Sequence, residues 1–438
     1  MTTAADVNAQ KPKNLYLEGL LKQWEVPGGN AEAEWLGKLR QTAANQVLQS
    51  QLPNRREEAW RFTDLSELSQ TDFRVAQAAA DISDIEAWAL PETANSRLVF
   101  VNGRYNAELS DVSGLPAGAY VGSLAQLPSP QSGEVVKYLA RQAGATEVFT
   151  ALNTSALADG AVIWVEANVT VEIPIQLLFL SIASDPTISQ PRTLVVAKRG
   201  ASLQLVEQYA TVEPATYFTN GVTEIWVEDN AEVNHMRVQQ ESTQAYHIAK
   251  SAIAQARDSR YTCTDINLGG KLSRHNLEIY QTGEQTETQL NGLTVVSGKQ
   301  LADTHSLISL TKPYGSTAQL HKCIVGDRAH TVFNGKVLVP QAAQLTNAAQ
   351  LNQNLLLSPK ARVDTKPELQ ITADNVKCSH GATVSQLEPD ELFYLQSRGL
   401  SESAARTLLV DAFAAEILER IPLQSLRTKL TLAVGSAQ

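Results

Sequence analysis

The stretch Gln341-Ala342-Ala343-Gln344-Leu345-Thr346-Asn347-Ala348-Ala349-Gln350-Leu351-Asn352-Gln353-Asn354 carries a primary amide at every second position on average. Amide side chains form hydrogen-bonded ladders where turns of chain stack in register. The stretch lies within a longer region, residues 149–384, in which short segments alternate apolar and polar side chains, with Gly, Asn and Asp at the breaks. That alternation predicts short strands, and stacked strands with amide ladders are typical of a solenoid. We therefore expect this region to form a parallel β-helix.

A sandwich and a propeller are the other folds that many short strands could form. A propeller should repeat a blade motif about every 40 residues, and the sequence shows none. A doubly wound or barrel α/β fold would need helices between the strands. No helix of ordinary length is predicted between residues 149 and 384. The β-helix is therefore the preferred prediction.

Helical periodicity marks the two ends of the chain. Residues 14–24 and 31–51 place large apolar side chains at helical spacing. Beyond the strands, a helix is predicted that ends at Gly399, and Ser401 can cap the next helix. We therefore divide the chain into an N-terminal helical and mixed region (residues 1–148), a β-helix core (149–387) and a C-terminal helical region (388–438).

Composition limits the classes of function. The net charge of −10 disfavours binding to the phosphate backbone of nucleic acids, which needs a basic surface. The most apolar run, residues 161–181, is interrupted by charged and amide residues, which argues against a membrane-spanning helix. Three cysteines are too few for a disulfide framework, and residues 1–6 lack the segments of an export signal. We therefore expect a cytoplasmic protein with no nucleic-acid or membrane partner.

Cys378 and His380 stand two residues apart in a strand-like segment at the end of the β region. Side chains alternate between the faces of a strand, so both point the same way. A thiolate beside an imidazole suits zinc, copper or an iron–sulfur species, whereas a core strand would use Cys378 as a small apolar side chain. His321 and Cys323 have the same two-residue spacing. If the two strands were neighbours, two histidines and two cysteines could form a four-ligand metal site.

The usual enzymatic motifs are missing. The sequence contains no GxxxxGK[ST], GxGxxG, GxSxG, HExxH or CxxC pattern, so this chain should not hydrolyse nucleotides by itself or hold a metal in a thiolate cage. We expect it not to be an enzyme. The alternative is a carbohydrate-active β-helix enzyme, which would use clustered carboxylates and basic residues. The candidates for that role are scattered along the sequence: Asp303, Asp327, Asp374, Arg328 and Lys322.

Several motifs together resemble the SufD group of the SufB/SufD family. They are Arg55-Arg56-Glu57-Glu58-Ala59-Trp60-Arg61-Phe62-Thr63-Asp64-Leu65, Val332-Phe333-Asn334-Gly335-Lys336, Leu355-Leu356-Leu357-Ser358, Asn375-Val376-Lys377-Cys378-Ser379-His380-Gly381-Ala382-Thr383-Val384, Leu392-Phe393-Tyr394-Leu395 and Ser397-Arg398-Gly399. The resemblance implies a right-handed parallel β-helix between helical ends. It also implies a scaffold subunit of the SUF iron–sulfur cluster assembly complex, paired with SufB and driven by the ATPase SufC.

The resemblance also implies where partners and cluster meet this chain. His380 matches the position that the family implicates at the interface with SufB, where it would share a metal with that subunit, and Cys378 matches a neighbouring motif residue. The C-terminal helices would dock SufC through Leu392, Phe393, Tyr394, Arg398 and Phe413. The chain alone would bind no cofactor stably, and an iron–sulfur cluster would be held transiently in the complex. In isolation the chain would form a homodimer.

The paralogous SufB-type subunit is the close alternative. SufB-type chains are similar but have a glutamate after the motif histidine and a cluster-building cysteine on a preceding rung. In this sequence Gly381 follows His380, and residues 351–355 contain no cysteine. These differences favour the SufD group.

Overall fold

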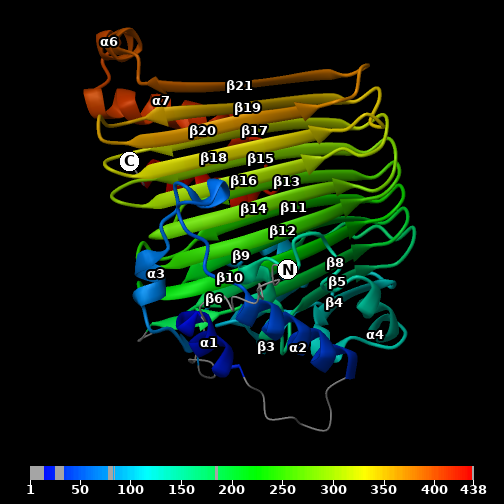
Figure 1. The fold of residues 1–438 in the computed structure, drawn as a ribbon. Coiled ribbons are helices and arrows are strands. Elements are labelled where there is room, and N and C mark those ends of the chain that lie inside the picture. Colours follow the sequence, from blue (N-terminus) through cyan, green and yellow to red (C-terminus); the bar gives the residue numbers. More distant parts are fainter. Residues whose placement is uncertain (1–13, 25–33, 77–81, 83, 183–185, 437–438) are drawn as a thin grey trace, which may run out of the picture.

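The predicted parallel β-helix between helical ends is confirmed. The computed structural model describes residues 14–24, 34–76, 82, 84–182 and 186–436. From β8 onward its strands alternate along the chain between two facing sheets, so that each sheet takes every second strand (Figure 1). The predicted helix over residues 31–51 is described from Glu34, and residues 31–33 lie outside the described residues, as do residues 1–6, where an export signal was sought.

The first sheet, called sheet A here, has 11 strands. They are β1 (Arg74–Val75), β4 (Ala119–Ser123), β5 (Ala161–Val165), β7 (Thr187–Ser189), β8 (Arg192–Ala197), β10 (Tyr217–Val227), β12 (Tyr246–Gln255), β14 (Leu272–Gln281), β16 (Leu301–Ser309), β18 (His330–Val339) and β20 (Arg362–Ile371). Sheet B has 10 strands. They are β2 (Arg97–Val101), β3 (Arg104–Asp111), β6 (Ile175–Ser181), β9 (Ser202–Thr211), β11 (Glu232–Gln240), β13 (Arg260–Asn267), β15 (Glu287–Val296), β17 (Ser316–Val325), β19 (Asn347–Leu356) and β21 (Lys377–Gln386).

Successive turns stack in register with about thirty residues per turn. Leu205 on β9, for example, pairs with His235 on β11, and the turns are closed at recurring corners. Asn230 and Asp258 occupy two such corners in the left-handed conformation, each with φ of 57°, which asparagine and aspartate tolerate better than most residues. The Asn and Asp at the breaks of the sequence pattern therefore set the repeat length of the solenoid.

Helices cover the outer faces of the two sheets. Near the start of the solenoid, apolar side chains of α1 (Leu15–Lys22), α2 (Glu34–Gln49), α3 (Ser66–Gln70) and α5 (Val148–Ser155) pack on the outside of sheet A. At the other end of the chain, α7 (Glu402–Leu418) and α8 (Gln424–Ser436) pack on the outside of sheet B. Two short elements, α4 (Gln131–Glu134) and α6 (Pro389–Ser397), complete the described α-helices.

The sheets begin earlier than the strand-like sequence pattern. Strand β2 pairs in parallel with β6, and β4 pairs antiparallel with β5, so segments well before residue 149 form the first rung. The boundary drawn at residue 149 falls inside helix α5, which is fully buried. Short strands separated by loops carry little periodicity, and their partners are set by stacking on the solenoid rather than by local pattern.

The predicted helix ends and buried strands follow the expected chemistry. Gly399 takes a φ of +95° after α6, and the Ser401 hydroxyl accepts a hydrogen bond from the Ala404 N–H, which caps α7. The most apolar run forms β5 and β6, whose residues are all buried. Within the described parts of the chain, no helix is long and apolar enough to cross a membrane.

The space between the sheets holds a charged network as well as apolar side chains. Glu207 lies 3.0 Å from His235 Nε2, and Asp265 accepts from Arg237 at 3.0 Å and lies 2.9 Å from His275. Although burial raises the pKa of Glu207, the hydrogen bond and charge of His235 outweigh that effect and lower the pKa to about 2. Each of these buried charges therefore has an oppositely charged or polar partner, as burial demands.

Acidification is expected to destabilise the fold from below about pH 6.5. Burial lowers the pKa of His321 to about 4, so the unfolded chain takes up a proton on this residue before the folded chain does, and stability falls between pH 6.5 and 4. Glu207 acts in the same direction below pH 4.5, because its folded pKa is also depressed. The His321 contribution is on the order of 3 kcal/mol.

Thermal unfolding at pH 7 and pH 4.5 tests this expectation. His321→Gln should show a smaller drop in Tm between the two pH values than the unmodified protein. His380→Gln, at an exposed position, should show the full drop. Equal drops in all three proteins would contradict the assignment.

Candidate functional site at the open end of the β-helix

Strand β21 is the last rung of sheet B (Figure 1). It pairs with β19 on one side, and among the described residues its other edge has no strand partner. Ala348 and Gln350 are the register partners of Cys378 and His380, and both partners are buried. Cys378 and His380 therefore stand on the inner-facing side of the strand, at the rim of the solenoid.

The two rim residues differ in exposure. Cys378 is partly buried against the apolar core between the sheets, and burial raises the pKa of its thiol. His380 is exposed, so it is not a buried core histidine in the isolated chain. Because metals bind the thiolate rather than the thiol, the imidazole of His380 is the readier ligand of the pair.

The other two cysteines are neutral, interior thiols. Burial raises the pKa of Cys323 to about 12 and raises that of Cys263 even further. Both side chains are almost fully shielded from solvent. Neither is a nucleophile or a metal-binding thiolate in the chain as folded.

The four-ligand site of His321, Cys323, Cys378 and His380 is not formed. Strand β19 lies between β17 and β21, so the two pairs are not on neighbouring rungs. The register also offsets them, since His321 stacks on Asn352 and then Ala382, whereas His380 stacks on Gln350. No group of three or more metal-ligating side chains occurs in the described part of the chain. The condition for that site, neighbouring strands, is therefore not met, because strand order and register cannot be read from spacing.

Amides fill the inside of the solenoid below the rim. The second half of the stretch rich in Gln and Asn lies in β19, and Gln350 Nε2 donates to Gln319 Oε1 at 2.8 Å on the rung beneath. Gln319 Nε2 in turn donates to Ser306 at 2.9 Å. On the outer face of the same rungs, a cavity of about 610 Å³ lies between sheet B and α7, and its lining includes Leu320, Leu351 and Arg420. One amide-to-amide step of the expected ladder, Gln350 to Gln319, is therefore present directly beneath the candidate site.

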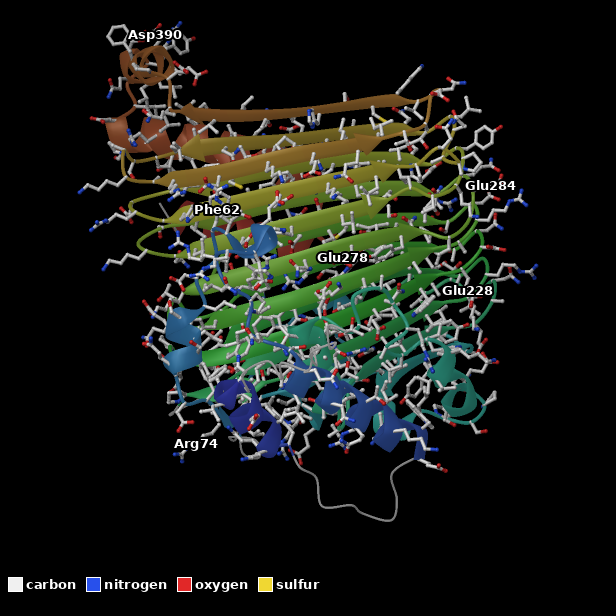
Figure 2. The ribbon with its side chains drawn as sticks, viewed as in Figure 1. Phe62, Arg74, Glu228, Glu278, Glu284 and Asp390 are labelled. Carbon is white, nitrogen blue, oxygen red and sulfur yellow. The ribbon has the colours of Figure 1, made fainter. Side chains whose placement is uncertain are left out.

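Helix α6 follows β21 and lies at the end of the solenoid where Asp390 is labelled in Figure 2. Phe393 and Tyr394 are exposed by 72% and 56%, and the Arg398 guanidinium lies 5.2 Å from the Tyr394 ring centre. Leu392 is half-buried. Two large aromatic side chains on one short exposed helix form an apolar surface of the kind that marks protein interfaces.

Phe413 lies apart from that surface. It is on α7 and packs partly against the apolar cluster on sheet B, with Lys322 Nζ 4.3 Å from its ring centre. Lys322 also pairs with Glu416 of α7. Phe413 is one of the five residues predicted to dock a partner. In this structure its side chain helps to hold α7 on sheet B.

The motif at residues 55–65 is a strap across the outer face of sheet A, where Figure 2 marks Phe62 (Figure 2). The Arg274 guanidinium lies 3.9 Å from the Trp60 ring centre, and the Thr63 hydroxyl donates to the buried carboxylate of Asp303. Glu58 pairs with Lys366 on β20. Sequence reasoning found this motif only by family resemblance, because its partners lie more than 200 residues away along the chain.

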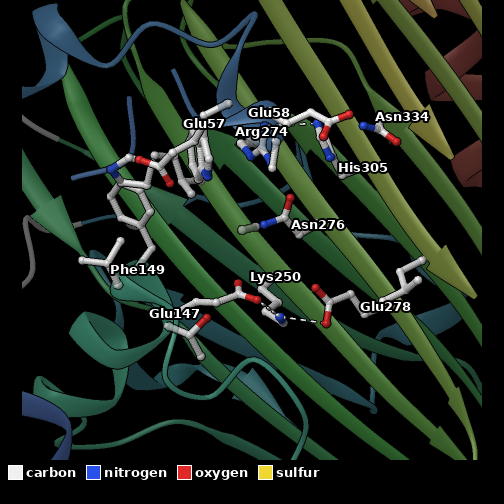
Figure 3. Close-up of a pocket in the computed structure, with 18 of the residues that line it drawn as sticks. Glu57, Glu58, Glu147, Phe149, Lys250, Arg274, Asn276, Glu278, His305 and Asn334 are labelled. Atoms are coloured by element: carbon white, nitrogen blue, oxygen red, sulfur yellow. Dashed lines mark hydrogen bonds and ion pairs between the residues drawn. The ribbon is translucent and has the colours of Figure 1, made fainter. Parts of the chain in front are cut away.

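A cavity of about 1020 Å³ lies between the strap and sheet A (Figure 3). Lys250 on its floor bridges Glu147 at 2.9 Å and Glu278 at 2.8 Å. The Arg274 guanidinium at its edge pairs with Asp303. Each of these cations is paired with a carboxylate. The pairs therefore hold the strap and α5 on sheet A, and they do not form a positively charged binding site.

The acids proposed for a carbohydrate-active enzyme are not brought together. Although burial raises the pKa of Asp303, the charges of Arg274 and His305 outweigh that effect and lower the pKa to about 2. Asp303 is thus a structural anion rather than a general acid. Asp327 accepts from the Gly298 N–H, and Asp374 accepts from Gln341. The three have no common partner, so this arrangement lacks the paired carboxylates of glycoside hydrolysis.

Comparison with known proteins places the chain in one family. The family described as "SUF system FeS cluster assembly, SufBD core domain" matches residues 179–413, and "SufBD protein N-terminal region" matches residues 23–177. An iron-sulfur cluster assembly SufBD family protein of Synechocystis is 49% identical, over 95% of this chain and 94% of that protein.

Two further relatives match along most of their length. Protein ABCI7, chloroplastic, of Arabidopsis thaliana is 35% identical, over 90% of this chain and 84% of that protein. Iron-sulfur cluster assembly protein SufD of Escherichia coli is 32% identical, over 89% of this chain and 90% of that protein. The chain therefore belongs to the SufBD family of the SUF iron–sulfur cluster assembly system.

Proposed function

We propose that this chain is the SufD-type, non-ATPase scaffold subunit of a SUF complex, in which an iron–sulfur cluster assembles at its interface with SufB. The observation that carries the proposal is β21, whose outer edge has no strand partner in the described part of the chain and which presents an exposed histidine at the open end of the solenoid. An open strand edge pairs readily with the edge of another chain. Pairing there would bring His380 directly to the partner subunit.

An incomplete ligand set suits this role. His380 offers one imidazole, and the cysteines of this chain carry neutral thiols because burial raises the pKa of each. SufB would supply the remaining ligands, including a thiolate, so the cluster would be held transiently and this chain alone would bind no cofactor stably. A site shared between two subunits can open when the subunits move, which favours release of the cluster to an acceptor.

The energy for that movement would come from SufC. The chain has no phosphate-binding GxxxxGK[ST] motif, so ATP hydrolysis would be supplied by the partner ATPase. Exposed Phe393 and Tyr394 on α6 are the proposed docking surface, with Leu392 and Arg398 beside them. We propose the cytoplasm as the compartment, since three free cysteines suit a reducing environment.

Co-expression with SufB and SufC tests the assignment. We expect all three proteins to co-purify through a tag on this chain, and the chain alone to elute as a homodimer in size-exclusion chromatography. A chain that captures neither partner would contradict the proposal. Turnover of a pectin-like polymer, lost on Asp303→Asn, would instead support the carbohydrate-active alternative.

A further inference from the structure

Gln350 has one end of its amide fixed and the other end without a partner. The side chain is 3% exposed, and its Nε2 donates to Gln319 Oε1. Gln319 is held in turn by Ser306. Gln350 Oε1 is buried and accepts no hydrogen bond. Buried acceptors almost always accept a hydrogen bond, so the missing donor to Gln350 Oε1 needs an explanation.

The rung above Gln350 carries His380. The two residues are register partners on β19 and β21, and neighbouring strands lie about 4.8 Å apart. The Gln350 amide lies inside the solenoid, close to Gly335 of the opposite sheet. Glu416 and Arg420 lie on the outer side of sheet B, where Arg420 donates to Asn291 and Glu416 pairs with Lys322.

Sheet A is shaped to admit the Gln350 amide. A Cβ atom on Gly335, across the interior on β18, would lie 2.3 Å from Gln350 Nε2, so the amide would have to leave its present position. Gly335 belongs to the motif Val332-Phe333-Asn334-Gly335-Lys336, which the proposed function leaves unexplained. The glycine thus keeps open the space in which the amide sits, and the position of Gln350 is built by both sheets.

We propose that Gln350 is a positioning residue for His380, with its Oε1 accepting a hydrogen bond from one imidazole N–H. This inference rests on the proposed function of His380 as a cluster ligand. A histidine that binds a metal through one nitrogen usually donates from the other to a carbonyl or carboxylate, which fixes the tautomer and the ring orientation. With one nitrogen bonded to Gln350, the other would present its lone pair across the rim toward iron of the nascent cluster.

Nitrogen NMR of the histidine side chains in the full chain, without partners or metal, tests the hydrogen bond. The resonances of His380 are assigned with His380→Ala. In the unmodified protein one tautomer should dominate, whereas Gln350→Leu should return His380 toward the mixture of a free imidazole. Gln350→Glu should restore the single tautomer, because a carboxylate oxygen also accepts a hydrogen bond from the imidazole N–H. Gly335→Ala should act like Gln350→Leu, because it displaces the amide.

Gln353→Leu is the matched control, since Gln353 is on the same strand but points to the other face. It should leave the His380 spectrum unchanged. Gln350→Met, closer in shape to glutamine, replaces Gln350→Leu if the leucine variant does not fold. In the complex with SufB and SufC, loss of the acceptor should lower bound iron and sulfide on the order of tenfold without lowering assembly.

These experiments distinguish failure of the positioning role of Gln350 from failure of the proposed function of His380. If His380 shows the same tautomer in the unmodified protein and in Gln350→Leu, positioning by Gln350 is overturned, even where His380→Ala loses its cluster. If the tautomer depends on Gln350 but His380→Ala loads iron and sulfide normally, His380 is not a ligand and the proposed site is overturned.

Discussion

Replacement of His380 by alanine is expected to abolish most cluster accumulation while leaving the fold and the complex intact. The side chain is exposed at the rim, so its removal opens no buried cavity, and exposed substitutions usually change stability by less than about 0.5 kcal/mol. If His380 completes a metal site shared with SufB, the complex loses a ligand that no neighbour replaces. We expect at least tenfold less iron and sulfide per complex, measured after anaerobic co-purification with SufB and SufC.

Two further variants are compared with His380→Ala for the iron and sulfide that each complex carries. Cys378→Ser should have a smaller effect, because the Cys378 thiol is partly buried and burial raises its pKa. His330→Gln removes another histidine, one that bonds Asp364 on the outer face of sheet A, and should load normally. If His380→Ala assembles and carries iron and sulfide at the unmodified level, the site is misassigned even though the family stands.

Simultaneous replacement of Phe393 and Tyr394 by alanine is expected to detach SufC. Both rings are largely exposed on α6, and α6 contributes no buried residue to the body of the protein, so the variant should fold normally. Aromatic side chains at the centre of an interface each contribute on the order of 2–4 kcal/mol. Loss of both should weaken binding of SufC about 100-fold or more, measured by calorimetry with the chain alone.

The groove between α7 and α8 supplies the control. Leu408 and Leu432 line this cavity of about 830 Å³ and are exposed by 49% and 70%. Leu432→Ala should leave SufC affinity within about twofold of the unmodified protein. If Leu432→Ala weakens binding while the α6 variant does not, the docking surface is the α7–α8 groove. Phe413→Ala should chiefly lower Tm, because Phe413 packs against sheet B.

The sequence by itself determined the class of fold and the ends of its helices. Alternation of apolar and polar side chains is a local property, because a strand faces inside and outside in turn, and it predicted strands within residues 149–384. Gly399 and Ser401 act through their own backbone and nearest neighbours, so these caps could also be predicted. The motif around His380 identified the family without any knowledge of contacts.

Only the tertiary structure decided which side chains meet. His321 and Cys323 have the spacing of Cys378 and His380, yet an intervening rung separates the pairs. Gln350 comes to lie beneath His380 because the chain between β19 and β21 closes one turn in that register, and Trp60 meets Arg274 across the outside of sheet A. Register depends on the length and geometry of every corner and on packing of the whole stack. These quantities are properties of the assembled solenoid, and no local pattern of residues encodes them.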